Sequence, residues 1–250
     1  MKRWQIINLI AFLMLIFATV SLIYILGKMD LTGPLGKPWH LLPAIHEDSL
    51  STTYKGSYQI MGKTPLRATL LDTTRTNVFI LVDAWGVPTE ENILKEDFKV
   101  VDSISSYFAL HQRLANFTRH AERAELRHNS TTSLFLFGGD SLQFNRQEYI
   151  PDIGFQNSIF CNDCDNSVII SQIDSILTEP EHPQFVAWTA LASTIGEHNK
   201  IRQTLTQIAD LAKRHPEVRF VVQGTHRPVL CGPETRNSYK AHWVPVAVLN

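Results

Sequence analysis

Polar side chains that can do chemistry follow several apolar runs of this sequence. Asp83 ends the run NVFILV, and Thr225 and His226 follow VRFVVQG. His198 follows QFVAWTA after a turn at Gly196. A carboxylate and an imidazole are common ligands of divalent cations, and an imidazole can also transfer a proton. The pattern makes Asp83, Thr225, His226 and His198 candidates to converge on one site.

A pair of hydroxyl side chains, Ser130 and Thr131, stands just before the apolar segment SLFLFGG. A hydroxyl at such a position can become a nucleophile when a metal or a neighbouring base lowers its pKa. Structural interpretations compete with each assignment. An Asp at a strand end is often a helix cap, Ser/Thr clusters cap turns, and a lone histidine is more often structural than catalytic.

The elements that must position these side chains alternate between strand and helix. The runs NVFILV, SLFLF, FVAWTA, VRFVV and VPVAV are continuously apolar, as strands buried on both faces are, and HNKIRQTLTQIADLAKRH is amphipathic. Residues 101–126 are also predicted to be helical. The alternation predicts a doubly wound, mostly parallel α/β sheet with helices on both faces. Sites in such sheets form at the carboxyl ends of the strands, so we expect these candidates to meet at one edge.

The N-terminal segment is predicted to anchor the chain in a membrane. Residues 6–26 are almost wholly apolar, and as a helix they extend about 32 Å, close to the thickness of a bilayer core. Lys2 and Arg3 precede them, which favours a cytoplasmic N-terminus. A cleaved signal peptide is the rival interpretation, but its apolar part is shorter and an A-x-A site should follow.

These patterns divide the chain into three regions. Residues 1–27 form a single transmembrane anchor, 28–75 a linker with peripheral strands, and 76–250 the α/β domain. The domain is expected on the periplasmic or extracellular side of the inner (plasma) membrane. The 23 basic and 24 acidic residues nearly balance, which gives no support to a nucleic-acid partner. Protein partners cannot be deduced from the sequence.

The three cysteines suit an oxidising compartment. Cys161 and Cys164 form a C-x-x-C, and Cys231 is the third. A disulfide is the default there, with three pairings open and Cys161–Cys164 the candidate. Free thiols are the alternative. A zinc knuckle would need two further ligands, and none follows locally.

Six segments, in order, resemble the alkaline phosphatase superfamily, which includes sulfatases, phosphoethanolamine transferases and lipoteichoic acid synthases. NVFILVDAWG is similar to its opening strand, which ends in an acidic metal ligand, and NSTTSLFLFGG to the segment with its nucleophile. IPDIGFQNSIF resembles its Gly-Tyr strand, and FVAWTALASTIGEH a segment ending in Gly-x-His. VRFVVQGTHRP corresponds to its strand followed by Asp-His-Gly, and YKAHWVPVAVLN to its closing strand. The resemblance covers residues 76–250.

The resemblance implies a metal-dependent phospho- or sulfo-transferase or hydrolase acting on an envelope lipid or polysaccharide, with zinc or manganese as its metal. It implies that Asp83, His226 and residue 225 hold the metal and that Ser130 or Thr131 is the nucleophile. His198 would protonate the leaving group or contact the transferred oxygens. Thr225 departs from the pattern, because the family has Asp there and a neutral hydroxyl is a poorer metal ligand. A later histidine of the family is matched only by His242. The alternative is a catalytically degenerate member without a metal, serving as a binding or scaffold subunit of an envelope machine.

A third hypothesis rests on the tetrapeptide Gly139-Asp140-Ser141-Leu142, which resembles the nucleophile block of GDSL esterases. Ser141 would be the nucleophile of such an enzyme. That class pairs its serine with a late Asp-x-x-His, whereas here Tyr239 stands three residues before His242.

Overall fold

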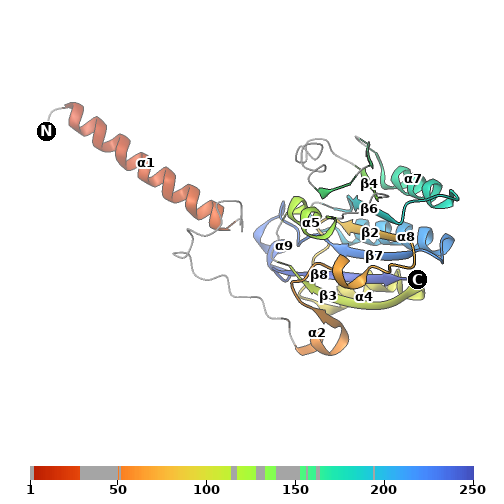
Figure 1. The fold of residues 1–250 in the computed structure, drawn as a ribbon. Helices are drawn as coiled ribbons and strands as arrows, with labels where there is room; N and C mark the ends of the chain where they lie inside the picture. The colour runs from red at the N-terminus through yellow and green to blue at the C-terminus, as the bar shows by residue number, and fades with distance from the viewer. Residues whose placement is uncertain are drawn as a thin grey trace. The chain divides into compact units, whose positions relative to one another are not determined.

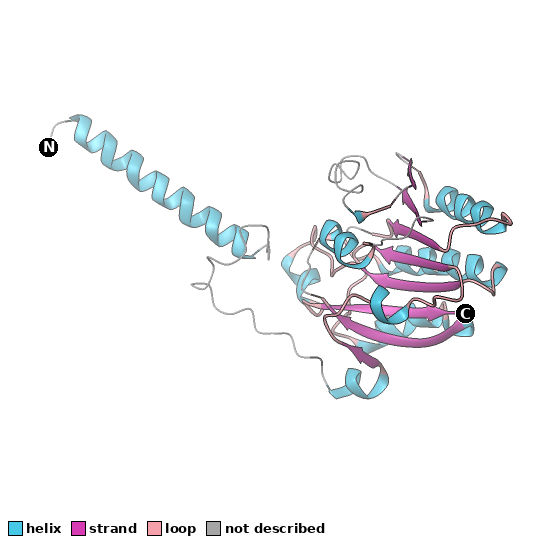
Figure 2. Ribbon diagram, viewed as in Figure 1, coloured by secondary structure: helices cyan, strands magenta, loops and turns pink. Residues whose placement is uncertain are grey.

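The computed structural model describes residues 3–28, 50, 52–113, 117–127, 133–138, 153–155, 157–161, 164–193 and 195–250. The chain divides into two compact units, Met1–His46 and Glu47–Asn250. Figure 1 shows the elements of both units in chain order, and Figure 2 shows which segments are helix and which are strand. Ser130, Thr131 and Ser141 lie outside the described residues.

The first unit contains the helix α1 (Arg3–Lys28), so the helix predicted at the N-terminus is present. Large apolar side chains of α1 are exposed, among them Trp4, Phe12 and Phe17. Among the described residues, no helix is both long enough and apolar enough to cross a membrane. The predicted transmembrane span is therefore not confirmed.

The second unit is built on one eight-stranded sheet in the order β1-β3-β8-β7-β2-β6-β4-β5. Strand β8 is antiparallel to both of its neighbours, and all other pairs of described strands are parallel. The predicted mostly parallel α/β sheet is confirmed. The strands are β1 (Gln59–Met61), β2 (Asn77–Val82), β3 (Ser105–Gln112), β4 (Ser133–Gly138), β5 (Asn157–Cys161), β6 (Phe185–Ala190), β7 (Arg219–Gly224) and β8 (Trp243–Leu249).

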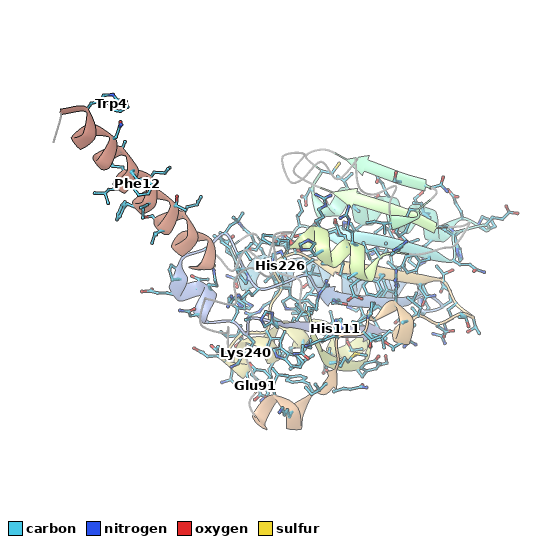
Figure 3. All side chains as sticks on the ribbon, turned by 60° about the vertical axis from the view of Figure 1, so that its left-hand side comes forward. Trp4, Phe12, Glu91, His111, His226 and Lys240 are labelled. Carbon is cyan, nitrogen blue, oxygen red and sulfur yellow. The ribbon has the colours of Figure 1, made fainter. Side chains whose placement is uncertain are left out.

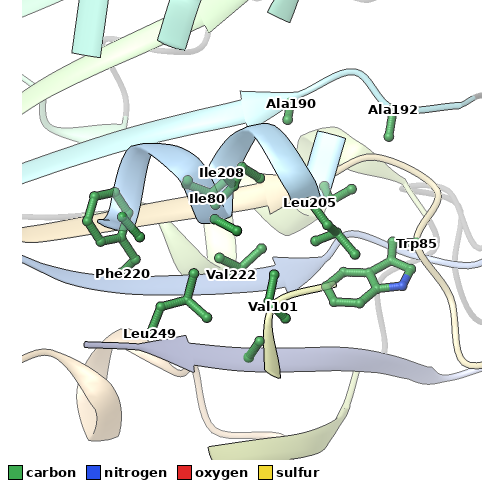
Figure 4. Close-up of a cluster of buried hydrophobic side chains, with 14 of the residues drawn as sticks. Ile80, Trp85, Val101, Ala190, Ala192, Leu205, Ile208, Phe220, Val222 and Leu249 are labelled. Carbon is green, nitrogen blue, oxygen red and sulfur yellow. The ribbon is translucent and has the colours of Figure 1, made fainter. Parts of the chain in front are cut away.

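Two apolar cores, one on each face of the sheet, hold the helices against it. Val78, Ile80 and Val82 of β2 belong to one core, which Figure 4 shows in close-up, and Phe79 and Leu81 belong to the other. Each fully buried large apolar side chain contributes about 1.5–3 kcal/mol. The helices are α2 (Thr52–Ser57), α3 (Arg67–Leu70), α4 (Glu91–Lys99), η1 (Asp102–Ile104), α5 (Thr118–Glu125), α7 (Asn166–Thr178), α8 (His198–Arg214) and α9 (Pro233–Asn237).

The prediction of a helix over residues 101–126 is wrong for most of that segment. Strand β3 occupies Ser105–Gln112, and the described helical residues of the segment are the short 3-10 helix η1 (Asp102–Ile104) and α5 (Thr118–Glu125). The first four residues of β3 are exposed or half-buried, so the strand does not alternate clearly between buried and exposed side chains. Without that alternation, the spacing of its apolar residues resembled the spacing in a helix. Because the helix begins only at Thr118, the first residue of α5 takes the place of the middle of a longer helix.

Candidate functional site

The ends of β2 and β7 bring two of the predicted site residues together. The strands are parallel neighbours with Val82 opposite Gly224, so Asp83 and Thr225 follow side by side. The Thr225 hydroxyl donates to Asp83 Oδ1 over 3.0 Å and accepts from the Ala84 backbone N–H over 3.1 Å. Both side chains are buried. The register of the sheet therefore fixes this pair.

The backbone around Asp83 is tightly packed against the turn after β7. A Cβ at Gly224 would lie 1.8 Å from the Trp85 carbonyl oxygen, so only glycine fits there. Ala84 has a φ of 53°, which is a left-handed conformation. This conformation is unfavourable for any residue other than glycine. Its N–H donates to Thr225, and that contact helps to hold the turn.

Thr118, the first residue of α5, completes the site and was not predicted from the sequence. Its Oγ1 donates to Asp83 Oδ1 over 2.6 Å and lies 3.1 Å from His226 Nε2. The side chain is buried. A threonine followed by a charged, amphipathic segment (TRHAERAEL) is typical of a helix start, and this signal could have been found had residues 101–126 not been taken as one helix.

His226 presents one defined ring nitrogen to the site. Its Nδ1 lies 2.6 Å from the Arg227 carbonyl oxygen, which can only accept, so Nδ1 carries a hydrogen. In the neutral ring, Nε2 is then the basic nitrogen, and it faces Thr118. Nε2 is also 3.5 Å from Asp83 Oδ1. Asp83, Thr118, Thr225 and His226 are named the strand-end cluster below.

The start of α5 adds a favourable field for an anion. Thr118 stands at the first turn of this helix, and no acidic side chain lies in that turn. The N-cap residue Phe117 provides no side-chain cap. Helix N-termini carry partial positive charge and orphan N–H groups, which favour a phosphate or sulfate group.

The strand-end cluster is a poor match for a tightly bound divalent cation. It offers one carboxylate, one imidazole and two neutral hydroxyls, whereas catalytic zinc sites use three imidazole, carboxylate or thiolate ligands. Asp83 Oδ1 already accepts two hydrogen bonds. Within the part of the chain that the structure describes, no three His, Cys, Asp or Glu side chains are grouped as a metal site. The donors do not fit the zinc or manganese site that the sequence resemblance implies.

His198 belongs to a different cluster, in which both of its ring nitrogens are used. Nδ1 is 2.9 Å from Asp97 Oδ2, and Nε2 is 2.8 Å from the Tyr239 hydroxyl. Asp97, which is fully buried, also accepts from Trp85 Nε1 and Arg202 Nε. Burial raises the pKa of Tyr239 to about 12. The structure thus brings Asp83, Thr225 and His226 together, but it joins His198 to other residues.

The cysteines are only partly described. Cys164 is disulfide-bonded, and Cys231 is a free thiol. The side chain of Cys161, the candidate partner, lies outside the described residues. The pairing therefore stays a prediction.

Comparison with known proteins finds no matching protein-family model and no matching curated protein. Similar solved structures include the lipoteichoic acid synthase LtaP from Listeria monocytogenes, with 8% identity over 70% of this chain and 65% of that chain and a TM-score of 0.49. The phosphoglycerol transferase GacH from Streptococcus pyogenes has 11% identity over 70% of this chain and 67% of that chain, with a TM-score of 0.47.

The C-terminal periplasmic domain of EptC from Escherichia coli, solved in complex with Zn, has 8% identity over 70% of this chain and 72% of that chain, with a TM-score of 0.49. A protein of the alkaline phosphatase superfamily from Vibrio parahaemolyticus is also similar, at a TM-score of 0.40. The match spans less than two thirds of the LtaP chain.

Proposed function

We propose that this chain transfers phosphoryl or sulfuryl groups, with Thr118 as the nucleophile in place of Ser130 or Thr131. The observation that carries the proposal is the position of Thr118 Oγ1, 2.6 Å from the Asp83 carboxylate and 3.1 Å from His226 Nε2. A hydroxyl with a base within reach can act as a nucleophile, and the N–H groups at the start of α5 can receive the oxygens of an anionic ester.

In the proposed step, Thr118 Oγ1 attacks the phosphorus or sulfur atom of the ester and the bond to the leaving oxygen breaks. The hydroxyl, which donates to Asp83 Oδ1 in the resting site, turns towards His226 Nε2, 3.1 Å away, and its proton passes to that nitrogen. Asp83 stabilises the imidazolium at 3.5 Å, and the Nδ1–H bond to the Arg227 carbonyl keeps the ring oriented. The proton then goes to the leaving oxygen, and the threonine ester is resolved by water or by an acceptor hydroxyl.

The substrate class that we propose is an ester on an envelope lipid or polysaccharide. Its support is the family resemblance of residues 76–250, together with the anion-favouring start of α5. The matching location is a domain on the outer side of the plasma membrane. A topology reporter fused after Asn250 tests this location, and activity of the reporter only in the cytoplasm would contradict it.

Covalent labelling tests the nucleophile directly. Full-length protein is incubated with p-nitrophenyl phosphate or p-nitrophenyl sulfate, quenched in acid, digested and examined by mass spectrometry. We expect a phosphate or sulfate on Thr118, retained as phosphoserine or sulfoserine in Thr118→Ser and absent in Thr118→Val. The matched control is Ser130→Ala/Thr131→Ala, which should still be labelled. A label on Ser130 or Thr131 in the wild type would exclude Thr118 as nucleophile.

A second candidate function is a degenerate member of the superfamily that binds such esters without turnover, as a binding or scaffold subunit. The observation that favours it is the neutral Thr225 hydroxyl bonded to Asp83, at the position where the family has a carboxylate. Calorimetric binding of a phosphate or sulfate ester, with no nitrophenol release above that of Thr118→Val, would select this function over transfer.

A further inference from the structure

Helix α5, which carries Thr118, is too short to hold its own position. It has eight residues, and isolated helices of that length are unstable in water. Its buried side chains are Thr118, Ala121, Glu122 and Glu125, which share one face of the helix. Contacts at Glu125, about 10 Å along the axis from Thr118, can therefore set where Thr118 stands.

Glu125 lies in a buried polar group that joins α5 to β3 and α3. Its Oε2 accepts from the Leu66 backbone N–H over 2.7 Å, just before α3 begins. Its Oε1 is 3.7 Å from His111 Nδ1 and 3.8 Å from Arg113 Nη1. Glu125, Arg113 and His111 are 2%, 4% and 1% exposed, and they form what we name the anchor cluster.

The charges in the anchor cluster are matched. Burial lowers the pKa of His111 to about 4, with the positive charge of Arg113 as a second cause, so His111 is neutral near pH 7. Burial also raises the pKa of Glu125, and the Arg113 guanidinium opposes that shift. A carboxylate–guanidinium pair remains, and the loss of one partner would leave a buried charge without its counterion. Figure 3 labels both His111 of this cluster and His226 of the strand-end cluster.

We infer that Glu125 is a positioning residue for Thr118. It fixes α5 against β3 and the start of α3, and this placement keeps Thr118 Oγ1 within hydrogen-bond distance of Asp83 and His226. The inference rests on the proposed function only for its activity readout, because the position of Thr118 can also be measured without turnover. A merely structural role would lower stability and leave the Thr118–His226 contact unchanged.

The test variant is Glu125→Gln in the full-length chain. Glutamine has the same size and keeps an oxygen for the Leu66 N–H, but it removes the charge that faces Arg113. The readout is the ¹⁵N NMR signal of His226 Nε2, which is sensitive to the position of the Thr118 hydroxyl 3.1 Å away. We expect this signal to move in Glu125→Gln towards its position in Thr118→Val. We also expect kcat per folded molecule to fall at least about tenfold with KM within about twofold, as for loss of an interaction made in the transition state.

Two further variants keep the test decisive. Glu125→Gln/Arg113→Gln has no uncompensated buried charge, so it should fold even where the single variant does not, and it should show the same displaced signal. Asp174→Asn is the matched control, because Asp174 pairs with Arg214 and His215, which belong to α8 and the residue after it. It should leave the His226 signal and kcat unchanged.

The outcomes separate this inference from the proposed function. An unchanged Nε2 signal in both Glu125 variants overturns the positioning role, whatever happens to stability. A displaced signal in a protein that shows no labelling or turnover at all would support the positioning role and would contradict the proposed transferase.

Discussion

The two ends of α5 are both buried and both polar, yet they differ in what they can do. At the first end, the Thr118 hydroxyl lies 2.6 Å and 3.1 Å from two bases, and its proton can move. At the last end, the Glu125 carboxylate lies 3.7 Å and 3.8 Å from His111 and Arg113, distances too long for hydrogen bonds. The first end can therefore support chemistry, whereas the second supplies a fixed charge that holds the helix.

The cluster of His198, Asp97 and Tyr239 resembles the Glu125 end in that its polar groups hold elements together. The sequence had placed His198 with the residues around Asp83 instead. Asp97 accepts from His198, Arg202 and Trp85, and both nitrogens of His198 are occupied. A polar residue at a strand end is thus not by itself a site residue. Its role depends on which of its polar atoms can still form a hydrogen bond with a substrate.

The largest expected effect on the rate of ester cleavage comes from replacing the Thr118 hydroxyl with a methyl group. Thr118→Val has nearly the same shape as the wild type and should lower the rate of ester cleavage at least about 10³-fold, because the nucleophile is lost. Thr118→Ser should retain activity within about tenfold. The measurement is nitrophenol release under single-turnover conditions. A Thr118→Val rate near that of wild type would remove the distinction drawn between the two ends.

The pH dependence of stability tests the anchor end. The folded-state pKa of His111 is about 4, below the ordinary value of 6.5, so the unfolded chain binds its proton more readily. The free energy of unfolding is therefore highest above pH 6.5, and it falls by about 3 kcal/mol in total as the pH falls towards 4. Urea unfolding at pH 7, 5.5 and 4 should show a smaller fall in His111→Gln than in wild type. Parallel pH curves would contradict the neutral state of His111.

Restoring a carboxylate tests the metal affinity at the Thr118 end. Thr225→Asp would place a second carboxylate beside Asp83, and we expect it to bind zinc or manganese about 100-fold more tightly than the wild type. Without metal it should be less stable, because the like charges repel. Thr225→Asn is the neutral control, and calorimetric titration is the measurement. Tight stoichiometric binding by the wild type, unchanged in Thr225→Asp, would show that the hydroxyl set is already a competent metal site.

The smallest expected effect on chemistry belongs to the His198 cluster. Asp97→Asn should lower the free energy of unfolding by about 2 kcal/mol, because its three donors lose a charged acceptor. The rate of ester cleavage should stay within about tenfold of the wild type. Thermal unfolding and the nitrophenol assay measure the two quantities. A rate loss near that of Thr118→Val would restore His198 or its partners to the catalytic group.

The amino-acid sequence by itself determined the buried strands β2, β6 and β7 and the meeting of Asp83 with Thr225 and His226. The buried strands were predicted because β2, β6 and β7 are apolar on both faces, a pattern that needs no knowledge of their partners. The three side chains meet because parallel neighbouring strands end at the same edge, so their proximity followed once the strands were identified.

Only the tertiary structure decided that Thr118 joins that edge and that His198 pairs with Asp97 instead. Thr118 and Asp83 are 35 residues apart in the chain, and no local pattern in the sequence encodes their contact. His198 is drawn away by Asp97, 101 residues earlier in the chain, which needs a partner because its charge is fully buried. The apolar pattern of a strand can be identified from its own residues. The partner of a buried polar group, in contrast, depends on which elements the folded sheet places beside it.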